Sequence, residues 1–187
     1  MDDQKHRIVR KGTVLVVVDI QEALFNVFKK EIGETLVHNV SLLVKLARKL
    51  DIPMLLTEQY PRGLKRTIQP LREILGQTTP LEKVTFSCCE APGFIERLAE
   101  LKAKHIILTG IETHVCILQT ALDLLKLGFK VFVPCDAVAS RWKLNWETGL
   151  RVMGESGAAI TSTEVLIFQL LHRADTEEFK YMAPALR

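Results

Sequence analysis

The sequence has no apolar run close to the roughly 20 residues that a helix needs to cross a bilayer. Its opening segment, MDDQKHRIVRKG, lacks both the apolar core of a signal peptide and the acid-free Arg/Ser pattern of a transit peptide. We therefore expect a cytoplasmic protein with no membrane partner. The sequence does not separate the cytosol from a mitochondrion or another organelle.

A strip of positive charge is also missing. The 25 Lys and Arg residues are scattered among 22 acidic residues, and the formal net charge is only +3. Nucleic-acid-binding domains concentrate their basic residues on one face. Nucleic acid is therefore not an expected partner.

The four cysteines, Cys88, Cys89, Cys116 and Cys135, follow neither a zinc-ribbon spacing nor a CxxC redox pair. In a reducing compartment they should be free thiols, so each needs its own explanation. His114 has no second histidine at a metal-binding spacing, so we interpret it as a pocket-wall or helix-start surface residue.

The length and composition of the chain favour one globular domain. With 187 residues, of which 48% are hydrophobic, the chain can bury one full core but not two ordinary ones. We predict a single domain over residues 1–187. Its core spans about residues 8–172, and a C-terminal extension, 173–187, packs on it or contacts a partner.

Apolar strand-like runs alternate with helical patterns along the chain. The run TVLVVVDI is typical of a strand buried on both faces. Strands separated by helices of this length imply right-handed crossovers and a parallel sheet covered on both faces, which predicts a three-layer, doubly wound, Rossmann-like α/β fold. The predicted strands lie within 13–20, 52–59, 81–87, 104–110, 129–140 and 158–163, and the predicted helices within 34–51, 65–75, 92–103, 113–128, 142–157 and 162–172.

Doubly wound sheets bind their ligands at the carboxyl ends of the strands. Those ends carry Asp19, Glu58, Lys83, the turn GIETHVC and Asp136. Taken alone, Asp19 is typical of a helix N-cap or of a link to a backbone amide, and Lys83 of a snorkelling edge residue. Taken together, they are a candidate buried ion pair.

Cys116 has two interpretations. If Thr113 caps the following helix, Cys116 lies in its first turn, where free amides and the helix dipole lower thiol pKa values to roughly 3.5–7.5. Cys116 would then be reactive. The alternative is a small core residue, the ordinary role of a cysteine and the one that we assign to Cys88, Cys89 and Cys135.

Three segments carry a family resemblance in their order and spacing. Asp19 in VVVDIQEALF, Lys83 in KVTFS and Cys116 in GIETHVC resemble the Asp/Lys/Cys triad of the isochorismatase-like cysteine hydrolases. The resemblance spans about residues 8–172. TEQYPRGL, GIETHVCILQTALDLL and CDAVASR look most like the eukaryotic isochorismatase domain-containing proteins, and GIETHVC is the most specific of these motifs.

The resemblance implies a mechanism. Asp19 would accept the thiol proton, Lys83 would hold the anionic pair, and Cys116 would attack a carbonyl carbon to give an acyl-enzyme that water hydrolyses. Relatives carry a non-proline cis bond before the residue that matches Glu112, and the amides of Glu112 and Cys116 would form an oxyanion hole. True isochorismatases lack the cysteine, so Cys116 favours acyl chemistry on an amide-like group.

Departures from the relatives bear on metal and substrate binding. Nicotinamidases of this family bind a metal through an Asp and His pair after the second strand, whereas this chain has TEQYPRGL there, without a histidine. We therefore expect no metal and no cofactor. Glu58 and Tyr60 occupy this rim and either contact substrate or brace the loop. The expected substrate-binding residues are Gln21, Phe25, Glu58, Tyr60, Thr113 and His114.

The predicted activity is cysteine-dependent hydrolysis of a small amide, ureido or related carbonyl compound, in a homo-oligomer that is a dimer or tetramer. Trp142 and Trp146 stand at i, i+4 and would form one helical patch, used as a subunit interface, a lid or core packing. Three other functions stay open. They are a non-catalytic binding or scaffold protein, a ribonuclease, which is a label carried by proteins of this branch, and a redox-sensing thiol.

Overall fold

The computed structural model describes residues 6–186, so residues 1–5 and 187 of the predicted domain lie outside the described residues. Its centre is a seven-stranded parallel sheet with the strand order β3-β2-β1-β4-β5-β7, in which β6 pairs with β4. The strands are β1 (Thr13–Val18), β2 (Met54–Gln59), β3 (Leu81–Lys83), β4 (His105–Ile111), β5 (Lys130–Pro134), β6 (Val138–Ala139) and β7 (Ala159–Thr161).

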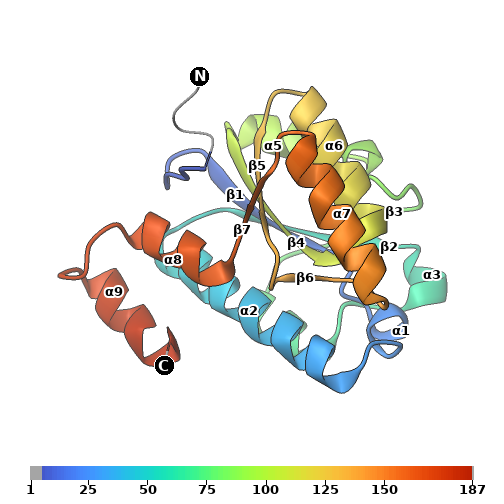
Figure 1. Ribbon diagram of the computed structural model, residues 1–187, viewed down its shortest axis with the longest axis horizontal. Helices are drawn as coiled ribbons and strands as arrows, with labels where there is room; N and C mark the ends of the chain where they lie inside the picture. The colour runs from blue at the N-terminus through green and yellow to red at the C-terminus, as the bar shows by residue number, and fades with distance from the viewer. Residues whose placement is uncertain (1–5, 187) are drawn as a thin grey trace.

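Helices cover both faces of this sheet, with α6 and α7 on one side and α2 and α8 on the other (Figure 1). The doubly wound α/β fold predicted from the sequence is confirmed. No helix in the described part of the chain is long and apolar enough to cross a membrane. The helices are α1 (Glu22–Phe25), α2 (Lys30–Lys49), α3 (Pro61–Leu64), α4 (Gln69–Leu75), α5 (Phe94–Glu100), α6 (Leu118–Lys126), α7 (Lys143–Glu155), α8 (Thr163–Leu171) and α9 (Glu177–Met182), with short turns η1 (Cys88–Glu90), η2 (Thr113–Ile117) and η3 (Ala183–Leu186).

β1 runs through the centre of the molecule because both of its faces are apolar. Leu15 and Val17 pack into one buried cluster with α2, α4 and α8, whereas Val14 and Val16 pack into another with α5, α6 and α7. Only a continuous apolar run can bury both faces of a strand in this way. Each such side chain stabilises the fold by roughly 1.5–3 kcal/mol.

The strand order reverses between β1 and β4, and doubly wound sheets bind their ligands beyond the carboxyl ends of the strands at such a reversal. The two strands approach closely there. Gly110 of β4 pairs with Val18 of β1 and has a φ of 122°. A Cβ at Gly110 would lie 2.0 Å from the Val18 carbonyl oxygen, so this position requires glycine.

β3 is shorter than the predicted strand over 81–87, because it ends at Lys83. The chain then turns so that the carbonyl oxygens of Thr85 and Phe86 accept hydrogen bonds from Lys83 Nζ, at 3.2 and 3.1 Å. A buried ammonium needs such acceptors. The demand of one charged side chain therefore ends the strand.

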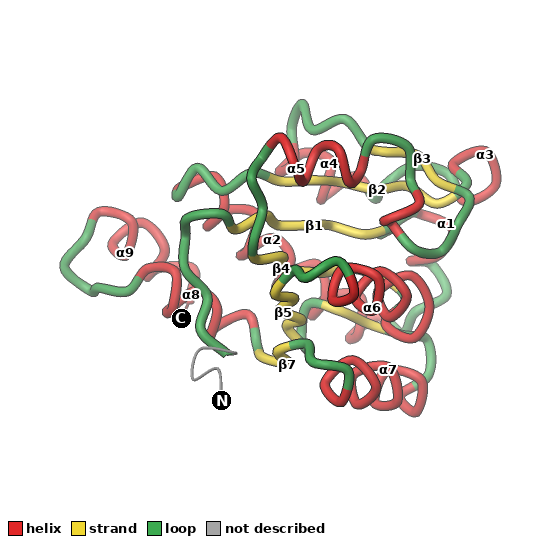
Figure 2. Tube along the Cα trace, turned by 90° about the horizontal axis from the view of Figure 1, so that it is seen from above, coloured by secondary structure: helices red, strands yellow, loops and turns green. Residues whose placement is uncertain are grey.

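The C-terminal extension is partly packed. α9 lies at one end of the molecule, away from α6 and α7 in two perpendicular views (Figures 1 and 2). Met182 is only 1% exposed, and the ring of Phe179 lies 6.3 Å from that of Phe168 on α8. Met182 and Phe179 thus pack on the rest of the chain, whereas the division into a core and an extension stays a prediction.

Replacing Gly110 with Ala tests the close approach of β1 and β4. We predict a loss of at least about 3 kcal/mol in the free energy of unfolding, because backbone must shift to admit the Cβ. Urea titration followed by circular dichroism measures it. The matched control is Gly128→Ala, where φ is also positive, at 86°, but nothing lies within 4 Å of the new Cβ. The Gly128→Ala substitution should lower the free energy of unfolding by only about 1 kcal/mol. Equal losses in the two variants would contradict the steric explanation.

Candidate active site

Asp19 and Lys83 form an ion pair that is fully buried. Lys83 Nζ lies 2.7 Å from Asp19 Oδ2, and both side chains are 0% exposed. Burial lowers the pKa of Lys83, but the Asp19 carboxylate and the nearby Cys88 and Cys116 outweigh it, and the net shift is upward. Lys83 is therefore a permanent cation at neutral pH. The candidate ion pair predicted at the strand ends is present.

The backbone at Asp19 aims its carboxylate into the site. Directly after β1, Asp19 has a φ of 54°, a left-handed conformation that aspartate tolerates better than most residues. The Asp19 amide donates to the Thr57 carbonyl at 3.2 Å, and Thr57 Oγ1 donates to Asp19 Oδ1 at 2.7 Å. One carboxylate oxygen thus faces Thr57 and the other faces Lys83. Asp19 is not the helix N-cap that its residue type alone favours, because Gln21 takes that place before α1.

Cys116 lies on η2, a π-helical turn that follows β4. Single π turns occur often at functional sites because they re-aim a side chain within a helix. Cys116 is 5% exposed, and it lies close enough to Asp19 and Lys83 for both charges to act on the pKa of its thiol. The fold therefore brings Asp19, Lys83 and Cys116 together from the ends of three strands.

The Cys116 thiol is protonated in the resting site. Burial raises its pKa most and the Asp19 carboxylate raises it further, whereas the Lys83 ammonium lowers it by less. The low thiol pKa predicted from a helix start is therefore wrong, because desolvation of the anion outweighs the amides and dipole of the turn. A nucleophile forms here when a base removes the thiol proton.

Thr113 does not cap the helix as predicted. Glu112 precedes the turn, Thr113 lies inside it, and the Thr113 side chain is buried with no hydrogen-bond partner for Oγ1 within residues 6–186. Its backbone instead packs against α7, where a Cβ on Gly149 would lie 3.0 Å from the Thr113 carbonyl oxygen. Close packing on α7, rather than a cap, holds this turn.

Glu112 connects β4 to the turn, and the peptide bond between Ile111 and Glu112 is cis. The Glu112 carbonyl accepts hydrogen bonds from the amides of Val115 and Ile117, at 3.0 and 3.3 Å. Its carboxylate accepts two more from the amide and Nε of Arg141, at 3.0 and 2.9 Å. The Glu112 side chain is thus anchored by Arg141, and the oxyanion role of the Glu112 and Cys116 amides stays a prediction.

Gln21 and Glu58 brace the strand ends. Gln21 Nε2 donates to the carbonyls of Gln59 and Lys65, and Gln21 Oε1 accepts from the Gln59 amide. Glu58 Oε1 accepts from the amide and hydroxyl of Thr67, at 2.6 and 2.8 Å. Because both side chains are buried and engaged in this way, the structure favours bracing over the substrate contacts that we predicted for them.

The other predicted pocket residues have separate surroundings. Phe25 packs against α2, where a Cβ on Gly33 would lie 2.8 Å from its ring. Tyr60 is 53% exposed and lines a groove of about 500 Å³ that also contains Lys83 and Glu90. His114 lies between Ser140 Oγ, 3.0 Å from Nδ1, and Asn145 Nδ2, 3.2 Å from Nε2, which is consistent with a wall residue.

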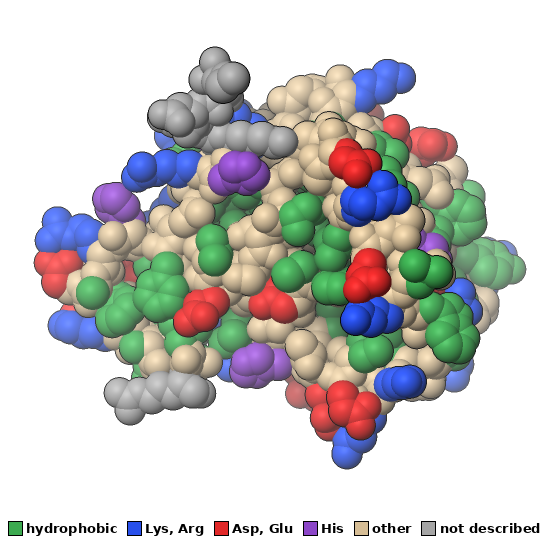
Figure 3. All heavy atoms as spheres, in the orientation of Figure 1, with side chains coloured by type: hydrophobic (Ala, Val, Ile, Leu, Met, Phe, Trp, Pro, Cys, Tyr) green, Lys and Arg blue, Asp and Glu red, His purple; other side chains and the backbone are tan. Residues whose placement is uncertain are grey.

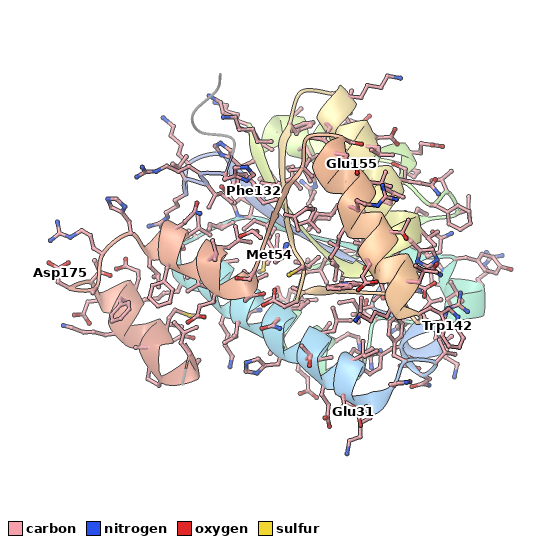
Figure 4. The ribbon with its side chains drawn as sticks, viewed as in Figure 1. Glu31, Met54, Phe132, Trp142, Glu155 and Asp175 are labelled. Atoms are coloured by element: carbon pink, nitrogen blue, oxygen red, sulfur yellow. The ribbon has the colours of Figure 1, made fainter. Side chains whose placement is uncertain are left out.

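Trp142 and Trp146 differ in exposure. Trp142 precedes α7 and is 66% exposed, whereas Trp146 is half-buried and donates its indole N–H to the Cys135 carbonyl at 3.0 Å. Figure 4 shows Trp142 at the end of α7 nearest to Glu31, where α2 begins. Trp146 and Glu31 both line a hollow of about 570 Å³ at this edge of the molecule.

Three residues near the triad were missed in the sequence. Thr57 and Gln59 hold Asp19 and Lys83, and Cys88 Sγ lies 3.8 Å from Thr57 Oγ1. The alternation in TEQ at the end of β2 was the available signal, because Thr57 and Gln59 share one face of that strand. Among residues 6–186, no group of three or more His, Cys, Asp or Glu side chains is placed to hold a metal ion.

Residues 13–165 match the model of the isochorismatase domain. The chain belongs to the isochorismatase family. It is 38% identical over 186 residues to isochorismatase family protein 1B of Dictyostelium discoideum, covering 95% of this chain and 87% of that one. It is 37% identical over 177 residues to isochorismatase domain-containing protein 2A of Mus musculus, covering 93% and 82%. The predicted family, with its eukaryotic branch, is confirmed.

Solved isochorismatase-family structures share the fold. One, described as the structure of MAR1 ribonuclease from Caenorhabditis elegans, superposes with a TM-score of 0.88 at 36% identity and covers 96% of this chain and 92% of that one. A hypothetical protein from Trypanosoma cruzi superposes with a TM-score of 0.86 at 28% identity, covering 95% and 92%. The chain therefore has the fold of the isochorismatase-family hydrolases.

Lys83→Met tests the energetic dependence of Asp19 on its partner. Removing the ammonium leaves a buried carboxylate unpaired, and we predict a loss of about 3–5 kcal/mol in the free energy of unfolding at pH 7. The double variant Asp19→Asn/Lys83→Met should recover much of that loss, because no unpaired charge remains. Urea titration of the three proteins measures both effects. A double variant no more stable than the single one would contradict the ion-pair explanation.

Cys88→Ala tests how buried thiols make stability depend on pH. Burial, with the Asp19 carboxylate, raises the pKa of Cys88 from 9.0 to about 12. Above pH 9 the unfolded chain therefore releases this proton before the folded chain does, and stability falls as pH rises. Between pH 8 and 10, wild type should lose about 1.4 kcal/mol more than Cys88→Ala under reducing conditions.

The control for this pH comparison is Val131→Ala, which also truncates a buried side chain but removes no titrating group. Its unfolding free energy should fall by the same amount as that of wild type between pH 8 and 10. Parallel pH dependences for wild type and Cys88→Ala would show that the Cys88 thiol is not buried in the folded protein.

Proposed function

We propose that this protein is a cysteine hydrolase of a small amide, ureido or related carbonyl compound, acting through an acyl-cysteine intermediate. The observation that carries the proposal is that Cys116 lies beside Asp19, whose carboxylate raises the pKa of the Cys116 thiol and is itself paired with Lys83 at 2.7 Å. A nucleophile, a base and a group that orients the base are the parts of a covalent hydrolase. They meet at the crevice where doubly wound sheets bind ligands.

The reaction begins with a neutral thiol. Asp19 takes the Cys116 proton as Sγ bonds to the carbonyl carbon, and the carbonyl oxygen becomes an oxyanion. The protonated Asp19 returns this proton to the leaving nitrogen as the carbon–nitrogen bond breaks, which leaves an acyl-cysteine. Asp19 then deprotonates an incoming water, whose oxygen attacks the acyl carbon. The departing sulfur recovers the proton, and the site returns to its first state.

Lys83 reduces the electrostatic cost of the proton transfer in this buried site. Before transfer, its ammonium is balanced by the Asp19 carboxylate, and the Cys116 thiol is neutral. After transfer, the thiolate carries the negative charge and Asp19 is neutral, so the charge of the group is unchanged. Charges buried without a partner cost far more than balanced ones. The amides of Glu112 and Cys116 are proposed to stabilise the oxyanion.

A ribonuclease is the second candidate function, because the Caenorhabditis elegans structure with 36% identity carries that description. The charges of this chain do not favour it. Acidic and basic side chains are interspersed on the face drawn in Figure 3, without the basic track that a phosphate backbone requires. Attack by a thiolate on a carbonyl also has no direct counterpart in phosphodiester cleavage.

The protein is also proposed to assemble with itself, as a dimer or tetramer. The apolar side chains of Trp142 and Leu144 at the start of α7 are 66% and 72% exposed, which is more typical of an interface than of a free surface. The structure of an Escherichia coli protein with the same fold is described as an octameric hydrolase.

Screening small amides and ureido compounds against wild type, Cys116→Ala and Asp19→Asn tests the proposed function. Wild type should release amine and show a transient acyl adduct on the Cys116 peptide by mass spectrometry. Cys116→Ala should show neither, and Asp19→Asn should be slower by a factor of about 10²–10⁴ because it lacks the base.

Cys135→Ala is the matched control, since it removes a half-buried thiol outside the triad and should leave turnover unchanged. Turnover that survives Cys116→Ala would refute the covalent mechanism. Salt-dependent RNA cleavage that survives Cys116→Ala in purified protein would favour the ribonuclease instead.

A further inference from the structure

Gln59 ends β2, the strand that separates β3 from β1. Lys83 ends β3, and Asp19 follows β1, so the Lys83 side chain crosses the end of β2 to reach its partner. Gln59 pairs with Lys83 in the register between β2 and β3. Register partners in a parallel pair project to the same face, and the two side chains therefore lie side by side.

The Lys83 ammonium has more acceptors than protons. Nζ donates to Gln59 Oε1 at 2.6 Å and to Asp19 Oδ2 at 2.7 Å, and the carbonyls of Thr85 and Phe86 lie farther away, at 3.2 and 3.1 Å. An ammonium has three N–H bonds, so the two carbonyls share the third proton. Gln59 and Asp19 are consequently its two principal partners.

The side-chain amide of Gln59 is held in one orientation. Its Nε2 donates to the Val84 carbonyl at 2.8 Å, which leaves Oε1 facing Lys83. A flipped amide would set N–H against the ammonium and oxygen against the carbonyl, two repulsive contacts. The backbone of Gln59 is fixed as well. Its backbone N–H donates to Gln21 Oε1 at 2.7 Å, and its backbone carbonyl accepts from Gln21 Nε2 at 2.9 Å.

We infer that Gln59 is a positioning residue, whose side-chain oxygen holds the Lys83 ammonium against Asp19 and beside Cys116. The inference rests on the proposed function. A neutral acceptor suits this place because it directs the ammonium without adding a second negative charge that would compete with Asp19 for it. Gln59 is 7% exposed, so water cannot readily take over the same bond.

The test is Gln59→Met, which keeps the length of the side chain but removes the acceptor. Cys116 is alkylated with neutral iodoacetamide and with anionic iodoacetate, and the labelled peptide is quantified by mass spectrometry. The ratio of the two rates, anionic over neutral, reports the positive charge near the sulfur. A displaced ammonium should lower this ratio by about threefold or more, and the iodoacetamide rate itself by roughly tenfold, as a charged hydrogen bond is lost.

Gln69→Met is the matched control, because Gln69 is exposed and its side chain bonds to the exposed side chain of Glu73. Its ratio should equal that of wild type. If Gln59→Met does not fold, Gln21→Met replaces it, since that change releases the backbone of Gln59 and should lower the ratio in the same direction. An unchanged ratio in a folded variant, or an equal loss of both rates, would show a merely structural role and overturn the inference.

This experiment separates the inference from the proposed function. Alkylation consumes one reagent molecule per thiol and requires no hydrolysis, so it reports on Lys83 even if no amide is ever turned over. A lowered ratio together with no acyl adduct on Cys116 would support Gln59 as a positioning residue and refute the hydrolase. An acyl adduct on Cys116 together with an unchanged ratio in Gln59→Met would support the hydrolase and refute Gln59 as a positioning residue.

Discussion

The buried ion pair between Lys83 and Asp19 is the interaction on which the site depends. Two charges in a low-dielectric interior require each other, and each also requires further hydrogen bonds. The fold supplies them by ending β3 at Lys83, by turning the following carbonyls inward, and by placing Thr57 against the second oxygen of Asp19. The sulfur of Cys116 adjoins a charge arrangement that the rest of the chain already holds in place.

Much of this architecture could be predicted because it follows local rules. The apolar run at 13–18 and the alternation of strands with helices indicated the doubly wound sheet, and strand ends indicated Asp19, Lys83 and Cys116. The role of Gln59 depends on strand order, since β2 lies between β3 and β1, and no local pattern reports that order. The length of β3 was overestimated because the apolar residues after Lys83 favour a longer strand, whereas the chain turns there and brings the carbonyls of Thr85 and Phe86 to the Lys83 ammonium.

The state of the thiol shows where local reasoning fails in electrostatics. A cysteine near a helix start favours a thiolate if solvent reaches it, but burial and the adjacent carboxylate favour the protonated form at Cys116. Burial is a property of the folded chain. The comparison of these opposing effects therefore could not be made from GIETHVC alone, whereas the proximity of Asp19 could be anticipated from the family resemblance.

The crowded coordination of the Lys83 ammonium has a consequence for how the family can diversify. Each N–H of the Lys83 ammonium donates to an acceptor of the protein, so none is left to bind a ligand. Under the proposed function, substrate discrimination is left to the loops around the site, such as the one that carries the exposed ring of Tyr60. Those surfaces can change by mutation without disturbing the charged centre, so the proposed mechanism is compatible with many different substrates.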